Sequence, residues 1–197
     1  TIPVSNSPAL GNVSFDKTGA DGVPLTGGAF ILTGKNYADQ DVTMTASAVN
    51  GKVTFTNVPL SKTGQSYTIR ETDPPSGHYS TTAALTATVA YNASKSGVTV
   101  SVSPDTLVNI PLPGTVSFTK TGAGGALLTG GVFTLTGRDF ASNPVTITAS
   151  AVSGTVAFSN VPIGSYTITE TDSPAGYLMP GSAGILTATV DYNAGRT

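Results

Sequence analysis

The sequence contains no cysteine and only one histidine. The lack of thiols excludes disulfide bonds and thiolate metal sites. No other cluster of ligand side chains predicts a metal site or a cofactor, and no Ser/His/Asp set or phosphate-binding loop predicts an enzyme. Charged residues make up only 10% of the chain and the formal net charge is -2, so no basic patch predicts nucleic-acid binding. No run of roughly 18 apolar residues predicts a membrane span.

Threonine, serine, glycine, valine and alanine dominate the 197 residues, whereas strong helix formers are few. β-Branched residues favour extended strands, and the 23 glycines and 13 prolines supply turns between them. We therefore predict an all-β protein. The low charge and the abundant threonine are also typical of an extracellular polymer, so we expect the chain outside the cell.

The chain contains an internal repeat with an offset of about 100 residues. The shared stretches include Gly-x-Val-Ser-Phe-x-Lys-Thr-Gly and Leu-Thr-Gly-Gly-x-Phe-x-Leu-Thr-Gly. Each repeat has about seven short segments of alternating polarity between turn residues, which is typical of a small β-sandwich. We place one sandwich at residues 11–113 and a second at 114–197. In the first repeat the segments lie near 12–18, 29–33, 41–46, 52–57, 66–72, 84–91 and 97–109.

The second repeat has no counterpart of the last segment of the first repeat. That segment ends with Leu107-Val-Asn109-Ile-Pro111, and the chain stops at Thr197 before any match to it. Residues 1–10 supply a match instead, in Val4-Ser-Asn6-Ser-Pro8. We therefore expect residues 1–10 to be a terminal strand that completes a neighbouring or preceding domain, and the second sandwich to lack its last strand.

Polar residues share strand faces with core residues at three places in a repeat. The only two glutamates, Glu71 and Glu170, each follow a tyrosine and an isoleucine at alternate positions, and side chains alternate faces along a strand. Lys17 and Lys120 follow a valine and a phenylalanine in the same way, and Asn109 follows a leucine. An amine, a carboxyl and a carboxamide are therefore predicted to point into one core.

Such a set of groups permits two interpretations. One is a structural Lys–Glu ion pair with a capping asparagine, which is costly to bury. The other is a reaction, because burial lowers the pKa of a lysine and raises the pKa of a glutamate. A neutral amine can then attack the asparagine side chain while the glutamate transfers the proton. The products are a Lys–Asn isopeptide bond and ammonia. The residues alone leave both interpretations open.

Four motifs carry a resemblance to a known family: Val-x-Phe-x-Lys, Leu-x-Gly-Gly-x-Phe-x-Leu, Tyr-x-Ile-x-Glu-Thr-Asp-x-Pro-x-Gly and Asn-x-Pro. Together they resemble the B-type repeats of collagen adhesin (Cna-B, prealbumin-like) and related pilin domains, over nearly the whole chain. The resemblance implies tandem immunoglobulin-like β-sandwiches whose first and last strands are joined by an autocatalytic isopeptide bond. It implies Lys17 as the amine, Glu71 as the catalytic acid and Asn109 as the acceptor, with Lys120 and Glu170 as the second pair.

We therefore expect a non-enzymatic stalk or filament subunit of a cell-surface fibre, whose partners are copies of itself head to tail or adjacent repeats of a longer chain. In a head-to-tail fibre, residues 1–10 of one copy would complete the second sandwich of the next, and Lys120 would then join Asn6 with Glu170 as the proton shuttle. The alternative is an adhesin module that binds a host or matrix ligand. Asn92 and Asn193, in a repeated Tyr-Asn-Ala, are alternative acceptors, although strand alternation turns Asn92 outward.

Overall fold

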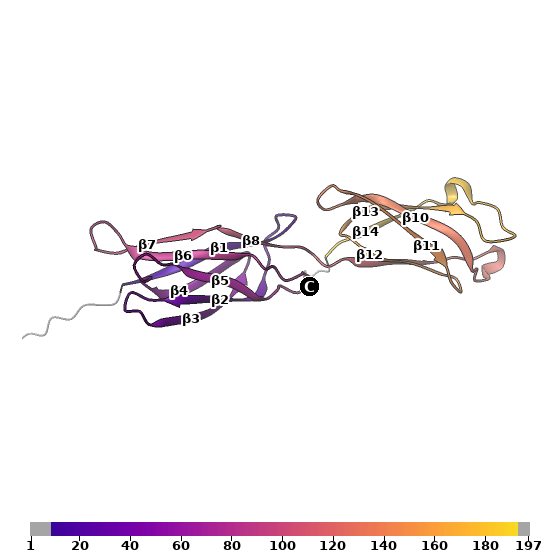
Figure 1. The fold of residues 1–197 in the computed structure, drawn as a ribbon. Coiled ribbons are helices and arrows are strands. Elements are labelled where there is room, and N and C mark those ends of the chain that lie inside the picture. Colours follow the sequence, from indigo (N-terminus) through magenta and orange to yellow (C-terminus); the bar gives the residue numbers. More distant parts are fainter. Residues whose placement is uncertain (1–8, 193–197) are drawn as a thin grey trace, which may run out of the picture. The chain divides into compact units, whose positions relative to one another are not determined.

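The structure is a computed structural model that describes residues 9–192, apart from the side chains of residues 182 and 183. The described chain consists almost entirely of strands, as the composition predicts, and forms two compact units (Figure 1). The first unit ends at Ile110 and the second begins at Pro111. Neither of the two short 3-10 helices in the described part is long or apolar enough to cross a membrane.

The first unit is built from eight strands in the hydrogen-bonded order β7-β6-β5-β2-β3-β4-β1-β8. The ladder is weakest between β3 and β4, where only two residue pairs connect the strands. The strands on either side of this link contribute to one shared apolar core, so they form the two layers of a β-sandwich. The strands are β1 (Leu10–Gly19), β2 (Gly27–Lys35), β3 (Asp41–Val49), β4 (Lys52–Pro59), β5 (Tyr67–Asp73), β6 (Ala84–Tyr91), β7 (Val98–Ser103) and β8 (Thr106–Asn109).

The end of the first unit differs from the sequence analysis in one respect. The segment 97–109 was predicted as a single strand, and this was wrong, because β7 and β8 are separate strands with different neighbours. Pro104 and Asp105 lie between them, and proline cannot donate to a sheet ladder. β7 pairs with β6 in one layer, while β8 pairs in parallel with β1 in the other.

The second unit repeats this plan with fewer strands. A four-stranded sheet has the order β11-β10-β13-β14, and a two-stranded sheet pairs β12 with β9. The strands are β9 (Gly114–Thr119), β10 (Gly130–Asp139), β11 (Pro144–Ala151), β12 (Thr155–Val161), β13 (Gly164–Asp172) and β14 (Leu186–Val190), and the 3-10 helices are η1 (Ala123–Gly125) and η2 (Gly181–Gly184).

The two units correspond strand by strand. The order β3-β2-β5-β6 matches β11-β10-β13-β14, and β4-β1 matches β12-β9. Among the described residues, the second unit has no strand at the positions that β7 and β8 occupy in the first. The core is correspondingly more open: Leu85 of β6 is fully buried, whereas its counterpart Leu186 of β14 is 40% exposed.

Candidate functional site

Lys17 lies near the end of β1 with no exposed surface, among the apolar residues of the first core. Strand alternation places it there, because it shares a face with Val13 and Phe15, both of which are buried. Its amine donates to the carbonyl oxygens of Thr18 and Leu107, each at 3.2 Å. Burial lowers the pKa of Lys17 to about 8, and the nearby charge of Glu71 opposes this effect. A substantial share of the amine is therefore neutral near pH 8, and a neutral amine is a nucleophile.

Asn109 is brought to this lysine by the parallel pairing of β8 with β1. Lys17 pairs with Leu107 and Gly19 pairs with Asn109, so the asparagine lies two positions beyond the lysine's partner and on the same face. Asn109 is also buried, at 1% exposure. Its amide nitrogen donates to the Tyr79 carbonyl at 2.7 Å and to Glu71 Oε2 at 2.8 Å. The side-chain carbonyl oxygen of Asn109 is buried without a hydrogen-bond partner among the described residues.

Glu71 reaches the same place from the opposite layer of the sandwich. It lies on β5, where it pairs with Phe30 of β2. Its Oε2 accepts hydrogen bonds from the Asn109 amide and from the Thr81 backbone N–H, the latter at 3.1 Å. Its Oε1 is buried and has no hydrogen-bond partner in the described part of the chain. The carboxyl group therefore contacts the nitrogen that a reaction at Asn109 would release.

The second unit holds the corresponding lysine and glutamate in a different arrangement. The Lys120 amine forms an ion pair with Glu170 Oε2 at 2.8 Å, and the side chains are 18% and 2% exposed. The backbone of Lys120 is anchored as in the first unit, because its N–H donates to the Gly154 carbonyl as that of Lys17 donates to Gly51. Lys120 also lies 5.6 Å from the centre of the Phe133 ring. Among the described residues, no asparagine forms a hydrogen bond with the side chains of this pair.

Aromatic rings line both sites. Phe15 and Phe30 meet edge to face at 5.5 Å in the first unit, and Phe118 and Phe133 do so at 5.2 Å in the second. Each pair joins one ring from each layer. Phe15 and Phe118 lie two positions before the lysine on its own strand, and Phe30 and Phe133 pair with the glutamate across the sheet. An apolar surrounding of this kind strengthens electrostatic interactions and disfavours charged forms.

The remaining candidate asparagines do not reach these sites. Asn92 holds a surface turn, where its Oδ1 accepts from the N–H groups of Ser96 and Gly97. It is therefore not placed as an acceptor for Lys17. Asn6 and Asn193 lie outside the described residues, so the structure does not show their positions.

Several groups that complete the first site were not predicted from the sequence. They are backbone groups: the carbonyls of Leu107 and Tyr79 and the N–H of Thr81. Every residue except proline carries an N–H and every residue carries a carbonyl, so neither has a sequence signature. The Tyr79 carbonyl and the Thr81 N–H belong to the connection between β5 and β6. The Asp-Pro-Pro-Ser-Gly motif at the start of this connection predicts a turn there, but it does not indicate which backbone groups reach the site.

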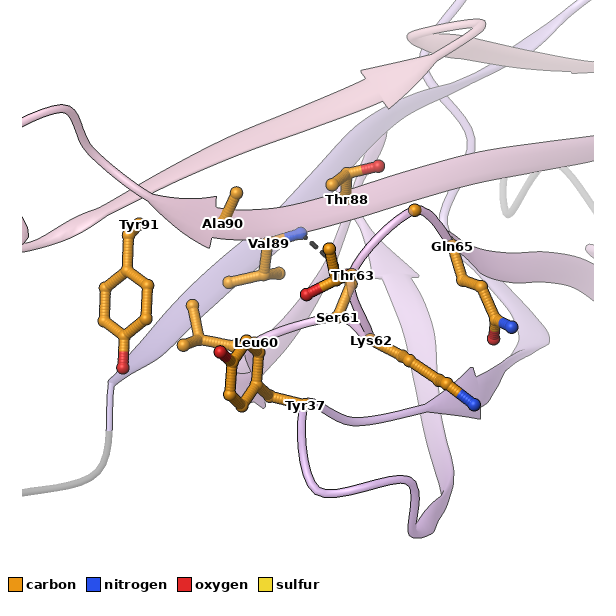
Figure 2. Close-up of a pocket in the computed structure, with 11 residues that line it drawn as sticks. Tyr37, Leu60, Ser61, Lys62, Thr63, Gln65, Thr88, Val89, Ala90 and Tyr91 are labelled. Carbon is orange, nitrogen blue, oxygen red and sulfur yellow. Dashed lines mark hydrogen bonds between the residues drawn. The ribbon is translucent and has the colours of Figure 1, made fainter.

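A separate pocket lies near the start of β1, about 220 Å³ in volume (Figure 2). The Tyr37 and Tyr91 rings meet edge to face there at 6.4 Å, and the Ser61 hydroxyl already accepts the Val89 N–H. Lys62 extends away from the apolar lining (Figure 2). An adjoining, more open pocket of about 340 Å³ shares Tyr37, Leu60 and Tyr91 with it, so pocket volume does not argue against the adhesin alternative. The described residues also include no group of three potential metal ligands.

The family model of the SpaA prealbumin-like fold domain matches residues 11–105 and again residues 114–195. The chain belongs to this family. The two matches correspond to the two units, so the tandem prealbumin-like, all-β sandwich fold predicted from the motifs is confirmed. A search among curated proteins found no match.

Solved structures of low identity resemble this chain over most of its length. The TIE protein of Bacillus anthracis is 19% identical, with a TM-score of 0.41, over 93% of this chain and 31% of its own. A streptococcal ancillary pilin is 20% identical, with a TM-score of 0.35, over 93% of this chain and 59% of its own. The shaft pilin SpaA of Lactobacillus rhamnosus GG is 17% identical, with a TM-score of 0.37, over 94% of both chains. The chain thus spans less than two thirds of the first two structures.

Proposed function

We propose that this chain is a structural module of a cell-surface fibre or stalk, and that an isopeptide bond between Lys17 and Asn109 stabilises its first unit. The observation that carries the proposal is the meeting of the buried Lys17 and Asn109 with Glu71, whose carboxyl contacts the Asn109 amide at 2.8 Å. As an unreacted set, these groups would leave two buried oxygens unpaired, which is costly. In the proposed reaction, Lys17 is the nucleophile, Asn109 is the acceptor and Glu71 transfers the protons.

The reaction is an acyl transfer from nitrogen to nitrogen. The neutral Lys17 amine attacks Cγ of Asn109, and the side-chain oxygen of Asn109 carries the developing charge. Glu71 accepts a proton from the attacking amine and delivers one to the departing nitrogen, which it already contacts through Oε2. The C–N bond to the amide nitrogen breaks and one ammonia leaves. The fold supplies proximity and orientation. The reaction occurs once per site, so the chain is not a turnover enzyme.

The position of the bond suits a load-bearing protein. The chain enters the first unit at β1 and leaves it after β8, and these two strands are paired in parallel. A pull on the two ends therefore shears β1 against β8. A bond between Lys17 and Asn109 joins the sheared strands covalently, so the long loop between the two residues is kept out of the force path. Unlike a disulfide bond, this link is not broken by reduction.

The second unit is proposed to react with a strand from outside itself. Lys120 and Glu170 are the counterparts of the first pair, and the edge of β9 is free of a described neighbour. An asparagine on a strand beside β9 would meet them as Asn109 meets Lys17. Asn6 of another copy is the candidate that the sequence offers. Such a head-to-tail contact is heterologous, so it builds an open fibre.

Intact-mass measurement of the folded protein tests the bond in the first unit. For the wild-type protein we expect a mass one ammonia below the mass calculated from its sequence. For Glu71→Gln we expect the full mass calculated from the variant sequence. The matched control is Glu170→Gln, which leaves the first unit unchanged and keeps the mass deficit. A wild-type protein with the full sequence mass would refute the isopeptide bond.

A denaturing gel tests the fibre. Species larger than the monomer that survive boiling in denaturant and disappear in Asn6→Ala would support the link to Lys120. A single monomer band would contradict it.

A further inference from the structure

The main chain of Tyr79 holds the end of β8 in the first unit. Its N–H donates to the carbonyl oxygen of Ile110, the residue after β8, at 2.9 Å. Its own carbonyl oxygen accepts the amide nitrogen of Asn109 at 2.7 Å. The Tyr79 side chain is exposed, whereas Asn109 is buried. Tyr79 therefore binds the acceptor residue through a backbone group that is independent of its side chain.

A local turn brings the Tyr79 carbonyl to this place. The N–H of His78 donates to the Pro75 carbonyl at 3.2 Å, and the equivalent bond closes the corresponding turn of the second unit at 3.0 Å. Gly77 lies inside the turn with a φ of 76°, a conformation that glycine adopts without strain. Because both units form this turn, it is a property of the shared Asp-x-Pro-x-Gly motif. The motif and the bond to Ile110 together set the position of the carbonyl.

The amide nitrogen of Asn109 carries two hydrogens, and two oxygens receive them. They are the Tyr79 carbonyl at 2.7 Å and Glu71 Oε2 at 2.8 Å. A backbone carbonyl can only accept hydrogen bonds, whatever the pH. Turning the amide over would set its own oxygen against both of these oxygens. The amide is therefore held with its nitrogen toward Glu71 and Tyr79, and its oxygen is buried without a hydrogen-bond partner in the described part of the chain.

We infer that the Tyr79 carbonyl makes this site specific for a carboxamide acceptor, so that an asparagine reacts at position 109 and an aspartate does not. A carboxylate there has no hydrogen to donate, and its oxygens would face the Tyr79 carbonyl and the Glu71 carboxyl. A protonated carboxyl has one hydrogen, which pairs with only one of these two oxygens. A buried site that binds a donor rejects an analogue lacking it, because its own groups are left unpaired. Tyr79 is thus a positioning residue of the site.

The intact mass of the full chain tests the choice of acceptor. The inference rests on the proposed function, and the wild-type protein shows through a deficit of one ammonia whether that function holds. An amide formed from an aspartate would release water instead, so we expect Asn109→Asp to keep the full mass calculated from its sequence. A deficit of one water in this variant, beside the ammonia deficit of the wild-type protein, would overturn the inference and leave the proposed function in place. A full mass in the wild-type protein would instead refute the proposed function.

Stability measurements separate the Tyr79 carbonyl from Glu71 and do not depend on the bond. Glu71→Gln and Glu71→Gln with Asn109→Asp are both expected to be unlinked, so denaturant unfolding compares them directly. In the double variant the glutamine amide can donate to the new carboxylate, and the Tyr79 carbonyl still opposes it. We expect its unfolding equilibrium constant at neutral pH to be at least about fivefold that of Glu71→Gln. The difference should shrink as the pH falls toward about 4, because a protonated carboxyl can donate to Tyr79.

Glu71→Gln with Asn92→Asp is the matched control. It adds the same charge in a surface turn where the residue's Oδ1 only accepts hydrogen bonds, so it should be as stable as Glu71→Gln. Equal stability of Glu71→Gln with and without Asn109→Asp would overturn the inference. A loss of stability in the double variant that does not change with pH would also overturn it, because it would show that the missing hydrogen is not the cause.

Discussion

Lys17 and Asn109 lie two positions out of register on paired parallel strands, with both side chains buried on the same face. A side chain as long as lysine reaches such a diagonal neighbour. Glu71 approaches from the opposite layer and binds the Asn109 amide, so the three groups meet only when the two layers are closed. The proposed bond can therefore form only in the folded unit.

The Glu71→Gln variant is expected to be less stable than the wild-type protein as well as heavier by the retained ammonia. Closing a loop on the scale of that between Lys17 and Asn109 stabilises a fold by about 4.6 kcal/mol in the chain-entropy model. We expect thermal unfolding of the first unit at a lower temperature and faster proteolysis. Glu170→Gln serves as the control, and an unchanged first transition in Glu71→Gln would argue against a covalent tie.

The stability of the unlinked first unit is expected to rise with pH. In Asn109→Ala no bond can form, yet Lys17 stays buried with a pKa near 8, below the value of 10.5 for a free lysine. Between these values the unfolded chain binds a proton that the folded chain does not, so stability increases with pH across this window, by up to about 3 kcal/mol.

The measurement for this effect is denaturant unfolding at a series of pH values from 7 to about 10.5. Asn109→Ala combined with Lys17→Met is the control, because methionine does not titrate and fills a similar volume. The difference in slope between the two variants isolates Lys17 from other groups that titrate in this range. Parallel curves for the two variants would show that Lys17 does not titrate differently on folding.

Lys120→Met is expected to destabilise the second unit by about 3 kcal/mol, because it leaves the Glu170 carboxylate buried without its partner. Replacing both residues, as Lys120→Met with Glu170→Leu, should restore most of this loss, since an apolar pair avoids the cost of burying charge. Chemical denaturation of the single and double variants measures the effect. A double variant as unstable as the single one would show that the ion pair is not the source of the loss.

Gly11→Ala and Gly114→Ala are expected to differ, although the two glycines are equivalent in sequence. The new methyl group at Gly11 would lie 2.7 Å from Val100 of β7 and 3.0 Å from Val89 of β6, and overpacking of this kind costs about 1–3 kcal/mol. At Gly114 the only close atom in the described part of the chain belongs to Val190, so the loss should be smaller. Thermal unfolding of the two variants compares them, and equal losses would contradict the more open core of the second unit.

Local patterns in the sequence determined much of this description. Alternation of polar and apolar residues correctly placed Lys17, Asn109 and Glu170 on buried faces, because a strand's period of two links every residue to a side of the sheet. The repeated motifs likewise predicted the all-β family fold. Alternation failed at the end of β6, where Tyr91 was expected inward but is 46% exposed and Asn92 lies in the turn that follows the strand. The alternation did not divide residues 97–109 into β7 and β8, although Pro104 and Asp105, where the break lies, are residues typical of turns.

How the polar groups meet depends on contacts between segments that are distant in the sequence. The carbonyl of Leu107 that receives the lysine amine and the N–H of Thr81 that binds Glu71 are backbone groups with no residue signature. The sequence also gave both lysine–glutamate pairs the same pattern, yet Lys120 binds Glu170 directly while Lys17 binds backbone carbonyls. The difference arises because β8 lies beside β1 and no described strand lies in that position beside β9. Which strands adjoin a site is a long-range property of the fold, and no local pattern encodes it.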